Sequence, residues 1–397
     1  MSIKIKKWFL ASLHGLFIFI LSWAWLSFYT TYDKETVFIE WASIIKRVFL
    51  NIDDDPPVKD YLFINLAHDK ELIADEMVPG NQVITDRAKL AALFNILKKN
   101  NESFKFFLCD VNLMGDSPND SLLAVSVAGV KKIVFPIHAA DGDSMELPKF
   151  NVPYALADYT TTGDMFFKYT LQTQKRFPTV PAYMYQQLNG GDIRWHPLYT
   201  TDKGRLIFNN FIVDFPIRSH EVFINREYPV VNLSELLLLP EEIIVDQFLK
   251  NRMILAGDFD NDVHSTIHGS TTGTLILLNT YFTLKNGYHI VSPFWIIMML
   301  IFFTLISYQL FFNKTFFARH QKNKRYSFIA SYLNYMAIMA AISICSYLVF
   351  NVYVNILIVA LYLNCISFLM GLKNKTSQLP SFQDMYINIK ETYFNFK

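Results

Sequence analysis

The chain has 397 residues, of which 52% are hydrophobic and only 18% are charged, and its mean hydropathy of +0.21 indicates a membrane protein. The net charge of +1 hides a division, because residues 31–290 carry 24 Lys and Arg against 33 Asp and Glu while the remainder of the chain is basic. This division fits one exported domain with cytoplasmic flanks and argues against nucleic acid as a partner.

The first apolar segment, residues 8–30, has 23 residues without a formal charge and follows Lys4, Lys6 and Lys7. It exceeds the roughly 20 residues that a helix needs to cross a bilayer. A cleaved signal peptide is the alternative, but its apolar region is shorter and ends in an Ala-x-Ala-like site, which the stretch Leu21–Leu26 does not offer. We therefore expect a cytoplasmic stub and an uncleaved signal anchor over residues 1–30.

Three further transmembrane helices are expected within residues 291–372, at 291–312, 327–350 and 353–372. Residues 313–325 contain five basic side chains and no acid, which predicts a cytoplasmic loop. The 47 uncharged residues from 326 to 372 are long enough for two helices, with a turn near Asn351 and Asn355. A short cytoplasmic tail, 373–397, follows. The lipid bilayer is thus one partner, and both termini are expected in the cytoplasm.

The segment between these helices, residues 31–290, is predicted to be a folded α/β domain that begins near Val58, after a proline-rich breaker at Pro56 and Pro57. Its only cysteine is Cys109, so disulfides cannot stabilise it and a hydrophobic core must suffice. Apolar runs and helical spacing predict the following elements: strands in 61–67, 104–111, 131–137 and 253–258, helices in 86–99 and 233–239, a helix or strand in 121–128, and an apolar run in 204–208.

The alternation of strands and helices predicts a mixed, mostly parallel sheet with flanking helices, because short strand–helix–strand units pair in parallel through right-handed crossovers. Asp86 is expected to cap the first helix. Gly190, Gly191 and Asp192 are interpreted as a turn rather than a phosphate loop.

Several segments resemble the second type of CHASE domain, an extracytoplasmic sensory domain. The matching segments are 63–69, Arg87, 107–111, 120–124, and above all 257–266 followed by 273–279. The family also has one transmembrane helix before the sensor and three after it, so the resemblance covers residues 8–372. It implies a ligand-binding sensory domain, and it implies placement in a bacterial inner membrane with the domain in the periplasm or outside.

The chain departs from the family pattern in three places. Thr272-Gly273 stands where the family usually has Pro-Gly, and residues 163–168 only loosely match its acidic-glycine-arginine turn. Family members commonly continue into a kinase, cyclase or phosphodiesterase, whereas this chain ends 25 residues after its last expected helix. The resemblance therefore implies signalling through a separate cytoplasmic protein.

The candidate ligand-binding residues are acidic and basic side chains at the ends of predicted elements. Asp69, Asp110 and Asp258 each stand at the C-terminal end of a predicted strand, and the carboxyl ends of parallel strands border the crevice where ligands bind. Capping of helices or loop turns is the alternative role for each. The full candidate set also contains residues from the matching segments: Arg87, which suits pairing with a carboxylate, Asp120, Asp262 and His264.

The loop at 258–268 has alternating Asp258, Asp260 and Asp262 followed by His264 and His268, which suggests a calcium loop or a zinc-binding His pair on a helix. An EF-hand loop would need Gly where Val263 stands and Glu where Gly269 stands. We therefore expect no metal and no cofactor. The chain also lacks a Gly-x-Ser-x-Gly elbow and a glycine-rich phosphate loop, so we expect no enzymatic activity.

Two functions follow. The first is a sensor or receptor-like subunit that binds a small molecule, peptide or envelope component; the second is a non-catalytic docking subunit of an envelope complex, and either could form a homo-oligomer. A transporter or channel is disfavoured, because the three C-terminal helices contain no charged residue. A concave site near Asp69, Asp110 and Asp258 would favour the sensor, and a broad exposed apolar patch would favour docking.

Overall fold

The computed structural model describes residues 3–26, 36–46, 56–74, 81–138 without 112 and 114, 150–171 without 159–164 and 167, 177–312 without 197 and 198, and 327–376. The chain forms two compact units. The helical unit contains residues 1–25, 293–349 and 353–397, and the α/β unit contains residues 26–292 and 350–352. The expected basic loop at 313–325 and the tail beyond residue 376 lie outside the described residues.

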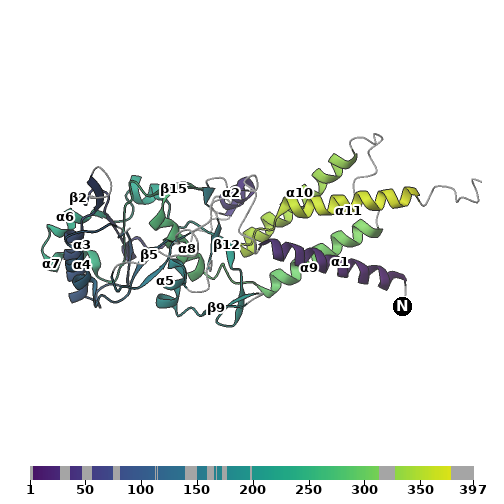
Figure 1. The fold of residues 1–397 in the computed structure, drawn as a ribbon. Coiled ribbons are helices and arrows are strands. Elements are labelled where there is room, and N and C mark those ends of the chain that lie inside the picture. The colour runs from purple at the N-terminus through teal and green to yellow at the C-terminus, as the bar shows by residue number, and fades with distance from the viewer. Residues whose placement is uncertain are drawn as a thin grey trace, which may run out of the picture. The chain divides into compact units, whose positions relative to one another are not determined.

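The helical unit is built from four helices: α1 (Ile3–Leu26), α9 (Pro293–Phe312), α10 (Ser327–Phe350) and α11 (Ile356–Thr376) (Figure 1). Within the described residues, three of them contain segments long and apolar enough to cross a bilayer, at Ile5–Ala24, Pro293–Phe312 and Tyr332–Phe350. The apolar part of α11, Ile356–Ser367, is shorter. The protein is thus a multi-pass membrane protein.

Polar side chains connect these helices. His14 on α1 forms hydrogen bonds with the Ser307 hydroxyl of α9 at 2.8 Å and with the Tyr362 hydroxyl of α11 at 2.9 Å. Trp295 on α9 donates to the Ser346 hydroxyl of α10 at 2.8 Å. Such hydrogen bonds stabilise helix association in a bilayer, because an apolar helix surface gains little free energy when it exchanges lipid for another apolar helix. They attach α11 to the bundle despite its short apolar segment.

The expected turn between the last two helices is confirmed. α10 ends at Phe350, and Asn351 adopts a left-handed conformation with φ +54°. Asn355 precedes α11, and its side-chain oxygen accepts a hydrogen bond from the Ile358 backbone N–H at 3.0 Å. Asn suits both positions, because its short amide tolerates positive φ and caps helix N-termini.

The centre of the α/β unit is a six-stranded sheet in which every neighbouring pair is parallel. Its order is β13 (Val230–Asn232), β1 (Tyr61–Asn65), β14 (Met253–Gly257), β4 (Phe106–Asp110), β5 (Ile133–Ile137) and β6 (Tyr154–Leu156). The predicted mostly parallel α/β sheet is confirmed. The last long strand, β14, lies between β1 and β4, so Asn65, Gly257 and Asp110 end three adjacent strands in register.

Helices cover both faces of this sheet. Leu62 and Ile64 of β1 belong to the core shared with α3 (Arg87–Lys99), α4 (Asp120–Val127) and α6 (Leu233–Leu237). On the other face α8 (Gly273–Lys285) contacts β14 and β4, and α5 (Val180–Asn189) packs on α8 and β5 (Figure 1). Strands buried on both faces read as continuous apolar runs, which explains why they were recognisable in the sequence.

The predicted helices of this unit form, with small shifts at their ends. Asp86 caps α3 by accepting a hydrogen bond from the Lys89 backbone N–H at 3.0 Å, as expected. Residues 121–128, predicted as helix or strand, correspond to α4, which runs from Asp120 to Val127. Gly190 ends α5 with φ +62°, so the Gly-Gly-Asp segment is a turn.

The remaining described elements are short. Two sheets have two strands each: β2 (Lys70–Ala74) with β3 (Asn81–Thr85), and β12 (Asn210–Ile212) with β8 (Lys168–Thr170). Two others have three strands each, in the orders β16 (Gly269–Thr272), β15 (Val263–Thr266), β7 (Met165–Phe166) and β11 (Arg205–Ile207), β10 (Thr200–Asp202), β9 (Ile193–Trp195). The further helical segments are α2 (Thr36–Ile44), Val58–Asp60, His220–Ile224, α7 (Glu241–Ile243) and Ile244–Leu249.

Candidate functional site

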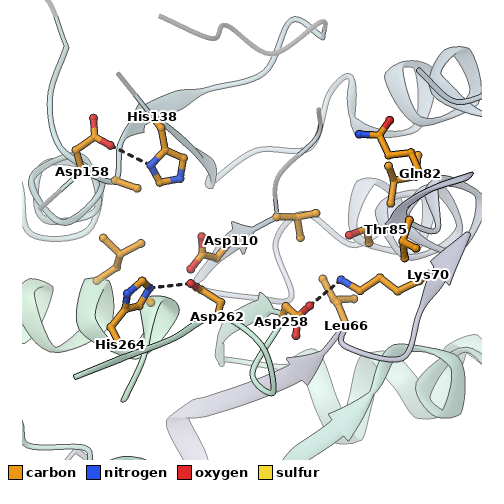
Figure 2. A pocket seen from close by; sticks show the side chains of 16 residues that line it. Leu66, Lys70, Gln82, Thr85, Asp110, His138, Asp158, Asp258, Asp262 and His264 are labelled. Carbon is orange, nitrogen blue, oxygen red and sulfur yellow. Dashed lines mark hydrogen bonds and ion pairs between the residues drawn. The ribbon is translucent and has the colours of Figure 1, made fainter. Parts of the chain in front are cut away.

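A pocket of about 620 Å³ lies at the carboxyl ends of the central strands (Figure 2). Its volume falls within the range of small-molecule sites. Five of the six strands supply lining residues at or just after their last residue: Leu66 after β1, Asp258 after β14, Asp110 in β4, His138 after β5 and Asp158 after β6. The parallel pairing causes this convergence, because all of these strand ends meet at one edge of the sheet.

The other walls come from elements added around this edge. The β2–β3 hairpin contributes Lys70, Gln82 and Thr85, and the β15 segment contributes His264 (Figure 2). Gly273 and Leu277 of α8 complete the lining from the other side of the sheet. The pocket therefore combines polar groups at the strand ends with apolar carbon from the core.

Three of the four lining carboxylates are paired with lining bases. These pairs are Lys70 Nζ with Asp258 Oδ2 at 2.7 Å, His138 Nδ1 with Asp158 Oδ1 at 2.9 Å, and His264 Nε2 with Asp262 Oδ1 at 2.8 Å. Asp110 differs, because within the described residues it forms no ion pair and accepts one hydrogen bond, from the Thr274 hydroxyl at 2.7 Å. In Figure 2 it lies between the two histidine pairs.

The environment of Asp110 disfavours its charge. Desolvation and, next, repulsion from the Asp262 carboxylate raise the pKa of Asp110 to about 6. The Thr274 hydrogen bond and the nearby His138 and His264 oppose this rise without cancelling it. The pKa of Asp110 is thus about two pH units higher than that of an exposed aspartate.

The neighbouring groups shift in directions set by their partners. The Asp158 hydrogen bond raises the pKa of His138 despite desolvation, and the charges of Asp110 and Asp262 add to the effect. Desolvation raises the pKa of Asp258, but hydrogen bonds from Lys70 and Asn261 outweigh it and hold that pKa below its usual value. Asp258 therefore stays an anion paired with Lys70.

Two glycines allow the strand ends and α8 to approach each other. A Cβ on Gly257, the last residue of β14, would overlap the Thr274 hydroxyl, and a Cβ on Gly273 would overlap the Asp262 carboxylate. The N-terminus of α8 can then lie beside Asp262 and Asp110, where its backbone N–H groups favour negative charge. Alanine at either position would therefore require the facing side chain to move.

Gly257→Ala is expected to destabilise the protein by about 1–3 kcal/mol, because the new methyl displaces the Thr274 hydroxyl from Asp110 in a packed site. Denaturant titration of the detergent-solubilised chain measures the change. Thr274→Ala removes the clashing atom, so the double variant should be no less stable than Gly257→Ala alone. Simple additivity of the two losses would show that the clash is elsewhere.

The structure brings four of the seven candidate residues together and leaves three outside the pocket. Asp110, Asp258, Asp262 and His264 line it. Asp69 also follows β1, but its side chain is fully buried away from the lining. It pairs with Lys89 Nζ at 2.8 Å and accepts the Ser234 N–H at 3.3 Å. Asp69 thus pairs with a lysine of α3 and accepts a backbone N–H at the start of α6, outside the pocket.

Arg87 and Asp120 form a second, separate cluster. The Arg87 side chain is fully buried, with its Nε 3.6 Å from Asp120 Oδ1. Glu71 accepts the Arg87 backbone N–H at 3.4 Å and the Ser117 hydroxyl at 2.7 Å. Desolvation lowers the pKa of Arg87, while Asp120 and Glu71 oppose that change. This cluster joins the β2–β3 hairpin to the starts of α3 and α4.

The 258–268 segment does not place its histidines on a helix. His264 lies in strand β15, and His268 lies in the turn before β16. The spacing of His264 and His268 therefore does not place them on one helical face, because antiparallel pairing with β16 gives the backbone at His264 an extended conformation. Among the described residues, no group of three or more His, Cys, Asp or Glu side chains is arranged to hold a metal ion.

The structure adds pocket residues that sequence reasoning did not select. His138 directly follows the predicted strand 131–137, so the strand-end rule applied to Asp110 would also have found it. Asp158 follows β6, a strand of three residues that leaves too short a pattern to read. Lys70 reaches the pocket because its hairpin folds back over the edge of the sheet. No local sequence pattern predicts that fold of the hairpin.

Comparison of the chain with the models of known protein families, with curated proteins and with solved structures found no match. The resemblance to the CHASE domain therefore stays a prediction from the residues quoted above. The structure itself places this chain among multi-pass membrane proteins with a parallel α/β unit.

Proposed function

We propose that this protein is a membrane-anchored sensor or receptor-like subunit whose α/β unit binds a small ligand in the pocket at the carboxyl edge of its sheet. The observation that carries the proposal is the convergence of five strand ends on one cavity of about 620 Å³. The ligand shifts the protein between two conformations because it binds one of them more tightly. The protein has no catalytic role of its own in this proposal.

The proposed topology places the α/β unit outside a bacterial inner membrane, in the periplasm, with both termini in the cytoplasm. The basic flanks and the acidic domain support this orientation. α11 acts as the fourth span: it has 21 residues, and its Tyr362 hydroxyl is bonded to His14 of α1. A separate cytoplasmic protein receives the signal.

Helix α8 supports a connection along the chain between the pocket and the transmembrane helix α9. Its first residues adjoin Asp262 and Asp110, and all of its residues except Lys285 are buried. After α8 the chain pairs with β11, through Phe208 N–H to His289 O and Val291 N–H to Leu206 O, both 2.9 Å. It then continues covalently into α9 at Pro293. A shift of α8 that follows ligand binding therefore acts on the segment that leads into a transmembrane helix.

Crosslinking with mass spectrometry on the full chain in its own membrane tests the proposal. Gln82 is an exposed residue of β3 that lines the pocket, so Gln82→Trp should obstruct the pocket with little effect on the core. Gln187→Trp, on the exposed face of α5, introduces the same side chain away from it. We expect the wild type and Gln187→Trp to crosslink to a cytoplasmic signalling protein with the same yield, and Gln82→Trp to change that yield.

The docking alternative predicts a different pattern. If only envelope proteins are recovered, in equal amounts for all three chains, the pocket plays no part in partner contact and the sensor proposal is wrong. A non-catalytic docking subunit of an envelope complex would then be the better description. Circular dichroism of the three purified chains checks that the tryptophan variants fold.

A further inference from the structure

We propose that the ligand of this pocket is a small organic amine whose ammonium group lies against the Asp110 carboxylate. This inference rests on the proposed ligand-binding function and goes beyond it by naming the chemical class of the ligand. It follows from the charges of the lining, from the pairing of each charged side chain, and from the apolar carbon beside them.

The described lining favours cations over anions. It contains four carboxylates, on Asp110, Asp158, Asp258 and Asp262, and one lysine. Lys70 is already paired with Asp258 at 2.7 Å, and both lining histidines contact carboxylates. An anionic ligand would thus meet four acidic groups and have to displace an existing partner from a base. Such like-charge contact is costly and discriminates strongly between ligands.

Asp110 is the lining carboxylate for which a cationic ligand would supply an ion-pair partner. The other three lining carboxylates are paired with a base, whereas Asp110 has only the Thr274 hydroxyl as a hydrogen-bond donor within the described residues. Asp262 lines the same pocket, and both carboxylates adjoin the first residues of α8, Asp262 at Gly273 and Asp110 at Thr274. An ammonium between them would donate hydrogen bonds to both and offset the desolvation of Asp110.

The pocket already accommodates one ammonium group, that of Lys70, which contacts Asp258 at this same sheet edge. The carbon skeleton of an amine would find apolar lining from Leu66, Val111 and Leu277. Phe, Tyr and Trp side chains, on which sugars commonly stack, are absent from the described lining. A compact aliphatic amine fits this combination better than a sugar or an organic acid.

Three four-carbon compounds separate the chemical classes by their end groups alone: 1,4-diaminobutane, 1,4-butanediol and succinate. Isothermal titration calorimetry of the full chain in nanodiscs should show saturable binding of the diamine and none of the diol or succinate. Asp110→Asn should weaken diamine binding about tenfold or more, because it removes one partner of a desolvated charge pair. Asp246→Asn, at a side chain that is 70% exposed, is the matched control and should bind as the wild type does.

Each other outcome overturns the inference. Equal binding of the diol would show that the pocket recognises hydrogen-bonding geometry rather than charge, and binding of succinate would reverse the sign of the ligand. Diamine binding that Asp110→Asn leaves unchanged would place the amine elsewhere. If none of the three compounds binds, the amine class is wrong, while the proposed function still stands or falls on the crosslinking response of Gln82→Trp.

Discussion

Asp110→Asn is expected to make the folded protein more stable than the wild type at neutral and alkaline pH. The site raises the pKa of Asp110 to about 6, because desolvation and the Asp262 charge disfavour the carboxylate. The unfolded chain holds the same group at an ordinary pKa of about 4. The asparagine amide keeps an oxygen to accept the Thr274 hydrogen bond and carries no charge, so it removes the unfavourable anion and retains the contact.

The sign of this effect depends on pH in a defined way. A carboxyl whose folded pKa is raised contributes its full stability below the unfolded pKa and loses it as the pH rises through the folded pKa, about 6 here. The wild type should therefore lose stability relative to Asp110→Asn from about pH 4 upward. The advantage of the variant should reach on the order of 2–3 kcal/mol at pH 8 and be about 1 kcal/mol smaller at pH 5.

Denaturant titrations of the detergent-solubilised full chain at pH 5 and pH 8 measure this difference. Asp246→Asn serves as the control, because its side chain is 70% exposed and its change should be close to zero at both values. If Asp110→Asn is less stable than the wild type at pH 8, the prediction is wrong, and the Asp110 carboxylate stabilises the fold as a hydrogen-bond acceptor. Stability gained together with ligand affinity lost is the pattern expected when a site retains an unfavourable group for its function.

Arg87→Met is expected to cost about 3 kcal/mol or more of folding free energy while leaving the pocket intact. The guanidinium is fully buried and lies 3.6 Å from Asp120, with Glu71 also acting on its charge. Methionine fills part of the volume but leaves two partly buried carboxylates without their cation. Removing one partner of a buried pair is costly for this reason, even where the intact pair adds little.

The pair can be tested through a second substitution. Arg87→Met with Asp120→Asn removes one stranded charge, so the double variant should be more stable than Arg87→Met alone. The calorimetric affinity of the folded Arg87→Met chain for 1,4-diaminobutane should equal that of the wild type, because neither Arg87 nor Asp120 lines the pocket. Affinity lost in the folded Arg87→Met chain would contradict this expectation and show that the cluster positions the β2–β3 wall of the pocket.

Local composition and periodicity in the sequence were enough to predict many of the strands and helices. Continuous apolar runs predicted β1, β4, β5 and β14, because strands buried on both faces need no polar alternation. Helical spacing and an aspartate before it predicted α3 with its cap at Asp86. Uncharged segments of about 20 residues predicted the membrane helices, since the bilayer sets both their length and their composition.

The strand order of the folded sheet determines which strand-end residues meet, and no local pattern contains that order. Insertion of β14 between β1 and β4 brings Asp258 to the edge where Asp110 ends, although 148 positions separate them in the chain. Asp69 lies four residues beyond the end of β1, and it pairs with Lys89 on α3 because the chain turns toward that helix before β2. The rule that polar residues follow strands selects candidates. Strand order and the path of each following loop choose among them, and both depend on contacts between residues far apart in the chain.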